Sequence, residues 1–174
     1  MTITLRRRLA QVGALVALAA LGAGCGGDDT KTVTAADYSF KDLPSSVDAG
    51  TELKLKNSST KELHEMVVVR IPDAEKRPVA DLVKLPEAQR DAIFGGGPPA
   101  MVLIAPPGGG EMIKAVGDGK LAEKGRYAVI CSIPTGADPA AYLKAAQAGG
   151  DGPPQVAGGP PHLVQGMFGE ITVK

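Results

Sequence analysis

The sequence predicts an all-β fold, an antiparallel Greek-key β-sandwich that carries two helical insertions. Three observations favour this fold. About seven short segments have strand-like patterns, turn residues separate them, and helices do not alternate regularly with strands. Parallel strands need a crossover connection, usually a helix, and the chain does not repeat such a unit. We therefore expect an antiparallel sandwich.

The strand segments are recognised by the period of their apolar residues. Residues 51–56, Thr-Glu-Leu-Lys-Leu-Lys, alternate polar and apolar side chains as a half-buried strand does. Residues 66–69, Met-Val-Val-Val, are continuously apolar, which is typical of a strand buried on both faces. The other segments predicted as strands are 31–34, 38–40, 112–116, 127–133 and 169–173.

Two segments break this pattern and are predicted as helical insertions. Residues 78–94 are expected to form a helix that breaks or restarts at Pro86, because proline can open a helix but does not continue one. Asp138 suits an N-cap and Pro139 the first helical position, so a second helix is expected over residues 138–148. The insertions span about residues 72–110 and 135–160, and their Gly- and Pro-rich parts, such as 95–99, 106–110 and 151–161, are expected to be loops.

The N-terminus predicts export and a lipid anchor. Arg6 to Arg8 precede an uncharged apolar run over residues 9–23, which is short for a membrane-spanning helix and right for a signal peptide. The run ends in Leu-Gly-Ala-Gly-Cys, which resembles the lipobox of bacterial lipoproteins, although Gly22 stands where Leu is usual. An uncleaved N-terminal anchor is the alternative, and both interpretations place the domain outside the cytoplasm, on the outer face of the cytoplasmic membrane or in the cell envelope. The expected organisation is a signal peptide over 1–24, a lipidated Cys25 with a tether over 25–30, and one domain over 31–174.

The charge of the chain excludes nucleic-acid binding. The whole sequence has 19 basic and 19 acidic residues. Loss of the three arginines with the signal peptide leaves 16 basic residues against 19 acidic ones, a net charge of about −3. A weakly acidic protein without a basic stripe has no electrostatic attraction for a phosphate backbone.

Cysteine usage points to a special role for Cys131. The chain has two cysteines, and if Cys25 carries lipid, Cys131 has no partner for a disulfide. Exported proteins normally pair their cysteines, so a single thiol suggests metal ligation or a reactive role. A buried, inert cysteine that packs as a small apolar residue is the alternative.

The remaining candidates for chemistry are His64 and His162, the two histidines of the chain, and Met167. His64 opens the most apolar strand segment, and His162 lies five residues before Met167, directly ahead of the last segment. Taken singly, a histidine is more often a surface or core residue, and a methionine usually fills space. Together with Cys131 they form the donor set of a mononuclear copper site, two imidazoles and a thiolate with a weak axial thioether.

The residues around this set resemble those of the cupredoxin family. Residues 125–131, Gly-Arg-Tyr-Ala-Val-Ile-Cys, resemble the plastocyanin and azurin pattern G-x-Y-x-x-x-C, and Pro134 continues it as C-x-x-P. Residues 162–173 resemble the plastocyanin pattern H-x-x-x-G-M-x-G-x-[IL]-x-V. Asn57 and His64 resemble the N…H segment that supplies the first histidine. The resemblance implies one type 1 copper held by His64, Cys131, His162 and Met167.

Two departures from the family pattern concern the site. Thirty residues, 132–161, separate Cys131 from His162, whereas small cupredoxins place both ligands in one tight loop. The ligands converge only if this excursion begins and ends at the same place, which costs little extra closure entropy. Glu65 follows the first histidine where plastocyanin-like proteins often have an Asn that hydrogen-bonds near the thiolate loop. We therefore expect that link to be missing.

The resemblance implies an exported electron carrier and not an enzyme. His162 is expected to be the electron port, with redox proteins docking transiently beside it and the inserted helix as a possible cover. The protein is expected to be a monomer, attached to the membrane through its N-terminal lipid. The alternatives are a copper-binding or copper-delivery lipoprotein and a metal-free binding module of the same fold. An enzyme is disfavoured because four protein ligands leave no open position for a substrate.

Overall fold

The structure is a computed structural model that describes residues 29–149 and 152–174. The predicted signal peptide, Cys25 and most of the tether lie outside the described residues. Within the described part, none of the helices has the length and apolar character that crossing a membrane requires.

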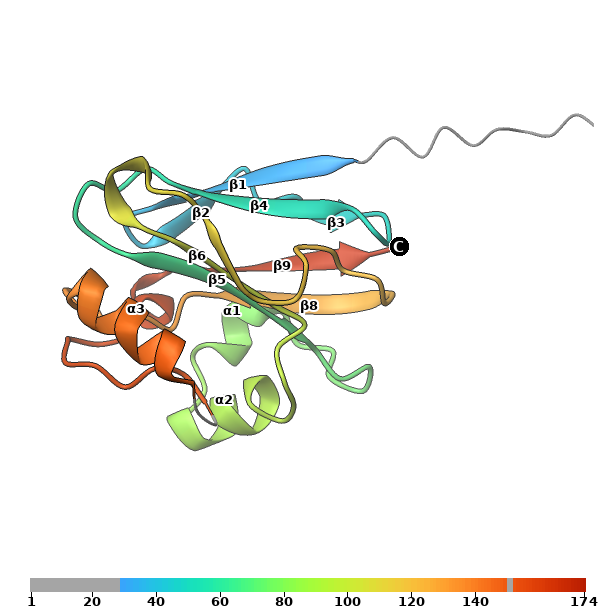
Figure 1. The fold of residues 1–174 in the computed structure, drawn as a ribbon. Helices are drawn as coiled ribbons and strands as arrows, with labels where there is room; N and C mark the ends of the chain where they lie inside the picture. Colours follow the sequence, from blue (N-terminus) through green and yellow to red (C-terminus); the bar gives the residue numbers. More distant parts are fainter. Residues whose placement is uncertain (1–28, 150–151) are drawn as a thin grey trace, which may run out of the picture.

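The described residues form two stacked β-sheets with helices at one end and on one face (Figure 1). The smaller sheet has the strand order β2 (Ser39–Lys41), β1 (Thr30–Ala36), β4 (Glu52–Asn57). The larger sheet has the order β3 (Ser46–Val47), β9 (Phe168–Val173), β8 (Gly125–Ile130), β5 (His64–Arg70), β6 (Met101–Ala105), β7 (Ile113–Val116). The predicted β-sandwich is confirmed.

The strand pairings differ in one respect from a purely antiparallel sandwich. Among the described strands, β1 pairs in parallel with β4, and β3 pairs in parallel with β9. The other pairings are antiparallel. After β2 the chain contributes β3 to the edge of the larger sheet and only then returns as β4, so it re-enters the smaller sheet running in the same direction as β1.

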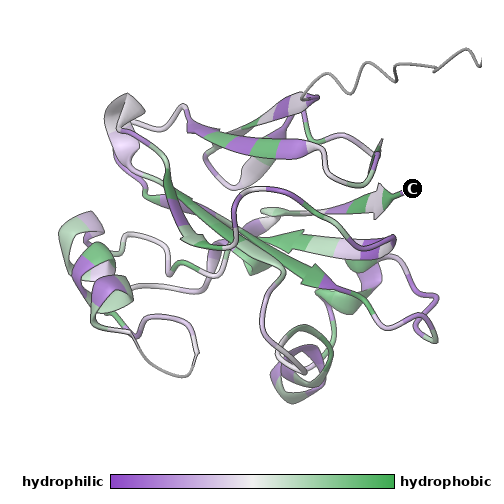
Figure 2. Ribbon diagram, turned by 45° about the vertical axis from the view of Figure 1, so that its right-hand side comes forward, coloured by the Kyte–Doolittle hydropathy of each residue, from purple (hydrophilic) through white to green (hydrophobic). Residues whose placement is uncertain are grey.

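The main core lies between the two sheets. On β4 the alternation read from the sequence places Leu53 and Leu55 inward and Lys54 and Lys56 in solvent. In Figure 2 the smaller sheet accordingly shows alternating hydrophilic and hydrophobic bands, whereas the larger sheet is hydrophobic along much of its strands. The burial of β5 follows from its place between β8 and β6, and its Met-Val-Val-Val run is the predicted two-sided strand.

A second apolar cluster covers the outer face of the larger sheet. The helices α1 (Val79–Leu82) and α2 (Glu87–Phe94) form the predicted helix that breaks before Pro86. Val79 and Leu82 pack with Ala128 and Ile130 of β8. Burial of these side chains against the sheet, rather than helix propensity, accounts for the stability of such short helices.

The strand β6 was not predicted. Its residues, Met-Val-Leu-Ile-Ala, lie in the stretch 72–110 that the sequence suggested as an insertion, yet β6 pairs with both β5 and β7 inside the larger sheet. An apolar run of five residues has no period to separate a buried strand from a buried helical segment. The Gly and Pro residues on both sides of this run favour a loop, so the sequence alone does not indicate a strand here.

The second predicted helix is α3 (Pro139–Ala148), at the end of the sandwich. Asp138 is its N-cap, and the Asp138 carboxylate accepts a hydrogen bond of 2.7 Å from the backbone N–H of Ala141. The described residues also include two short 3₁₀ turns, η1 (Pro107–Gly109) and η2 (His162–Gln165).

Candidate metal centre

The topology brings His64, Cys131 and His162 to one end of the larger sheet. β5 and β8 are antiparallel neighbours, and so are β8 and β9. The start of β5, the end of β8 and the start of β9 therefore lie at the same end. His64 is the first residue of β5, Cys131 follows β8, and His162 opens the η2 turn that leads into β9.

The three side chains converge in a fully buried cluster. One donor atom from each of His64, Cys131 and His162 lies within 4.8 Å of the other two. The Cys131 Sγ atom is 3.3 Å from Nδ1 of His162, and the two imidazole rings have centroids 5.0 Å apart. None of the three side chains is accessible to solvent. Three of the four residues predicted as copper ligands therefore lie together, and their binding of a metal stays a prediction.

The polar atoms of this cluster lack the partners that burial normally demands. Both ring nitrogens of His64 and Nε2 of His162 are buried without a hydrogen-bond partner among the described residues. An unsatisfied buried polar group costs about 1–3 kcal/mol. A metal ion bound between the two rings and Cys131 would give a partner to an unsatisfied nitrogen of His64, whereas Nε2 of His162 faces the Glu62 carboxylate, so the residues present fit a metal site.

The protonation preferences are consistent with this interpretation. Burial, together with the neighbouring His162, lowers the pKa of His64 to about 4, which keeps its imidazole neutral and able to bind a metal. Burial, reinforced by the carboxylates of Glu65 and Glu62, raises the pKa of the Cys131 thiol above its usual range. A cation beside the sulfur acts in the opposite direction, because metal coordination deprotonates a thiol.

Met167 lies next to the cluster through its backbone. Its N–H donates to the carbonyl of His162 at 3.0 Å, and its carbonyl accepts from the N–H of Cys131 at 3.2 Å. The Met167 side chain is completely buried. The axial role of its sulfur remains a prediction from the sequence motif.

The thirty-residue excursion between Cys131 and His162 returns to its starting point. The backbone N–H of Leu163 donates to the Cys131 carbonyl at 2.8 Å, and the N–H of His162 donates to the Ile133 carbonyl at 3.0 Å. Farther out, the N–H of Thr135 donates to the Pro160 carbonyl at 3.1 Å. These bonds pair the two ends of the excursion like the base of a hairpin, so its length does not displace the ligands.

Glu65 corrects one expectation. The link between the residue after the first histidine and the thiolate loop is present, because the Glu65 carboxylate accepts hydrogen bonds from both the N–H and the hydroxyl of Ser132. Its other oxygen accepts from the Tyr142 hydroxyl at 2.8 Å, and its backbone N–H points to Cys131 Sγ at 3.5 Å. Sequence reasoning missed this cluster. The available signal was an acidic residue at the start of a buried strand, which requires polar partners.

The outer side of the cluster is closed. The His162 ring, expected to be the electron port, is completely buried, with the Tyr38 ring edge-on at 5.1 Å. Nε2 of His162 is 3.5 Å from a Glu62 carboxylate oxygen, and Nε2 of His64 is 4.0 Å from the Asp37 carboxylate. Glu62 also accepts a hydrogen bond from the backbone N–H of Gly136, so it connects the segment 132–161 to the histidine that it covers.

Comparison with known proteins gives structural neighbours only. No protein-family model matches the chain, and no curated protein matches it. Solved structures that resemble it include three auracyanins. The auracyanin of Roseiflexus castenholzii is 20% identical to this chain. The alignment covers 86% of this chain and 99% of the auracyanin, with a TM-score of 0.45. Auracyanin A of Chloroflexus aurantiacus, described as a "blue" copper protein, is 16% identical to this chain. The alignment covers 85% of this chain and 100% of auracyanin A, with a TM-score of 0.43.

Proposed function

We propose that this protein is a cupredoxin, an electron carrier that holds one type 1 copper with His64, Cys131 and His162, and with Met167 as a weak axial ligand. The observation that carries the proposal is the convergence of three buried donor atoms, one of them on His64, whose two ring nitrogens have no hydrogen-bond partner among the described residues. Two imidazoles and one thiolate in a closed site are the donor set typical of blue copper.

The copper, when bound, supplies a centre that changes charge by one electron. The residues of this chain hold the donors in fixed positions. Cys131 is held by backbone hydrogen bonds to Met167 and Leu163, and Ser132, the residue after it, by the Glu65 carboxylate. His64 is fixed at the start of the most buried strand. A site preorganised in this way rearranges little when the charge changes, which favours rapid electron exchange.

The closed geometry supports an electron carrier over the alternatives. Because all three donors are inaccessible to solvent, a substrate has no approach to the site, which disfavours an enzyme. The same burial favours retention of a metal over its delivery to another protein. The proposal also includes export, a lipid anchor at Cys25 and transient redox partners. The sequence motifs support these parts, and the free thiol of Cys131 is consistent with a metal ligand in an exported protein.

The test is to add Cu(II) to the purified protein and to record the visible spectrum. We expect an intense thiolate-to-copper band that disappears on reduction and in Cys131→Ser. Zn(II), which binds the same donor types but has no redox chemistry, should compete for the site and abolish the colour. A colourless protein with weak affinity for copper would refute the proposal.

A further inference from the structure

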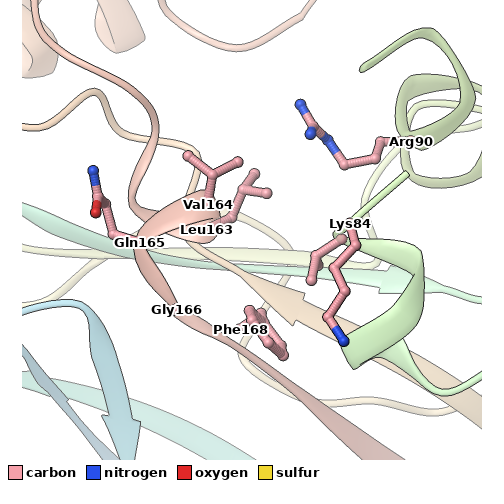
Figure 3. Close-up of a pocket in the computed structure, with 8 residues that line it drawn as sticks. Lys84, Arg90, Leu163, Val164, Gln165, Gly166 and Phe168 are labelled. Atoms are coloured by element: carbon pink, nitrogen blue, oxygen red, sulfur yellow. The ribbon is translucent and has the colours of Figure 1, made fainter. Parts of the chain in front are cut away.

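A groove lies between the inserted helices and the η2 turn (Figure 3). It has a volume of about 560 Å³. One side is apolar and is formed by Leu163 and Val164 of η2 and by Phe168 of β9; Val164 is 45% exposed. The other side carries Lys84, after α1, and Arg90, on α2. The groove therefore combines an exposed apolar contact with positive charge.

The charge of the groove comes from two cations. Among the residues that the structure describes, those that line the groove include Lys84 and Arg90 and no acidic side chain. Lys84 has an exposed ion pair of 3.4 Å with Asp81, and the Arg90 guanidinium donates to the Leu85 carbonyl. An exposed pair of this kind is weak and screened by water, so it leaves much of the Lys84 charge available to a partner.

The groove has a short connection to the thiolate ligand. Leu163 lines the groove, and its backbone N–H donates to the carbonyl of Cys131 at 2.8 Å. Leu163 is also bonded covalently to His162. Leu163 at the base of the groove is thus joined to His162 by a peptide bond and to Cys131 by a hydrogen bond, and both are proposed ligands.

The face over the histidine rings has the opposite character. The hollow there is lined by Asp37, Tyr38, Lys61 and Glu62 together with two small hydroxyl residues, and Tyr38 and Glu62 close off the His162 ring. Its two carboxylates outnumber its one cation, Lys61, and so disfavour an acidic partner, and the His162 ring is buried beneath it. The groove is the alternative route to the site.

We propose that this groove is the docking surface for an exported redox protein whose own contact patch is acidic around an apolar centre. The proposal rests on the proposed function and names the partner of that site. Lys84 and Arg90 would steer and orient the partner, and Val164 would make the apolar contact. In the exchange, the partner's centre is oxidised by one electron as Cu(II) is reduced to Cu(I), and no bond forms or breaks.

The probe for this surface is cytochrome c in two forms, the native basic protein and its succinylated, acidic form. Binding is measured by NMR amide shifts on the metal-free protein, and electron exchange with the copper-loaded protein is measured by stopped flow. We expect the acidic form to shift the amides of Val164 and Lys84 and its affinity to fall with salt. Lys84→Gln/Arg90→Gln should weaken binding about fivefold at low salt. Lys41→Gln/Lys56→Gln removes the same charge from the smaller sheet and should change affinity less than twofold.

A second pair of variants tests the apolar contact. Val164→Gln should weaken binding of the acidic form, whereas Val116→Gln, at an exposed valine of β7, should not. Tighter binding of the native basic form, mapped to Asp37 and Glu62, would overturn the proposal. An equal loss in both members of either pair would also overturn it. Because binding is read on the metal-free protein, a failure of the copper proposal shows separately as a colourless protein.

Discussion

The hydroxyl of Tyr142 donates a hydrogen bond of 2.8 Å to the carboxylate of Glu65, 77 positions earlier in the chain. Tyr142 is the completely buried residue of α3, inside the excursion between Cys131 and His162, and Glu65 follows the ligand His64. Because Glu65 also accepts from Ser132, one carboxylate joins the first ligand strand, the thiolate loop and the inserted helix. The helix is thereby fastened to the site.

The first prediction is that Tyr142→Phe changes both stability and the metal site. Removing the hydroxyl leaves one oxygen of a buried carboxylate unpaired, which should lower the free energy of unfolding by about 1–3 kcal/mol. Because the same carboxylate holds Ser132 next to Cys131, the thiolate-to-copper band and the reduction potential should shift as well. Chemical denaturation, the visible spectrum and voltammetry measure the three quantities.

The matched control is Tyr127→Phe. Tyr127 is also buried and donates to a backbone carbonyl, that of Glu123, at 2.8 Å, near the start of β8 and away from the metal centre. This variant should lose comparable stability with an unchanged spectrum and potential. If the two variants behave alike, Tyr142 has only a structural role.

The second prediction separates the shape of Glu65 from its charge. Glu65→Gln keeps an oxygen that accepts from Ser132 and replaces the other oxygen with an amide that can donate to Tyr142. Glu65→Ala leaves the Ser132 and Tyr142 hydroxyls without their partner inside the protein. We expect the glutamine variant to keep the copper spectrum of the parent protein and the alanine variant to lose it or to unfold. A glutamine variant as damaged as the alanine variant would contradict a positioning role that needs only hydrogen bonds.

The third prediction concerns the stability of the metal-free protein as a function of pH. The pKa of His64 is about 4 in the folded protein against an ordinary value of 6.5, because burial disfavours its charged form. The unfolded chain therefore binds more protons, and stability should fall as pH decreases from about 6.5 towards 4. Burial raises the pKa of Glu65 and so acts in the opposite direction. The His64 contribution is the difference between the parent and His64→Gln in urea denaturation, and a slope unchanged by the substitution would contradict it.

The sequence predicted the parts of the fold that have a clear period or a clear cap. The alternation of residues 51–56 predicted β4, and Asp138 with Pro139 predicted the start of α3. Met101–Ala105 was missed because a short apolar run looks the same in a strand and in a helical segment. The pairing of β1 with β4 is parallel because β3, which lies between them in the sequence, joins the other sheet. No local sequence pattern predicts which sheet β3 joins.

The same distinction holds for the site. His64, Cys131 and His162, which the structure brings together, were predictable because their donor types together suit copper and because family-like motifs flank them. The closure of His162 by Tyr38 and Glu62 was not, since it depends on loops that meet only in the folded protein. Nor was the Glu65–Tyr142 bond, because a 77-residue separation carries no signal in one sequence.

The last prediction tests the ligand that the structure places beside the site without showing its role. Met167→Leu preserves the volume of a fully buried side chain, so the loss of stability should stay below about 1.5 kcal/mol. If the Met167 sulfur is the weak axial ligand, its removal takes a donor from Cu(II), and the reduction potential should rise. Met101→Leu is the control, since Met101 is equally buried but pairs with Val68, at the other end of β6 from Ala105, which pairs with His64. Equal potentials in the two variants would exclude Met167 as a ligand.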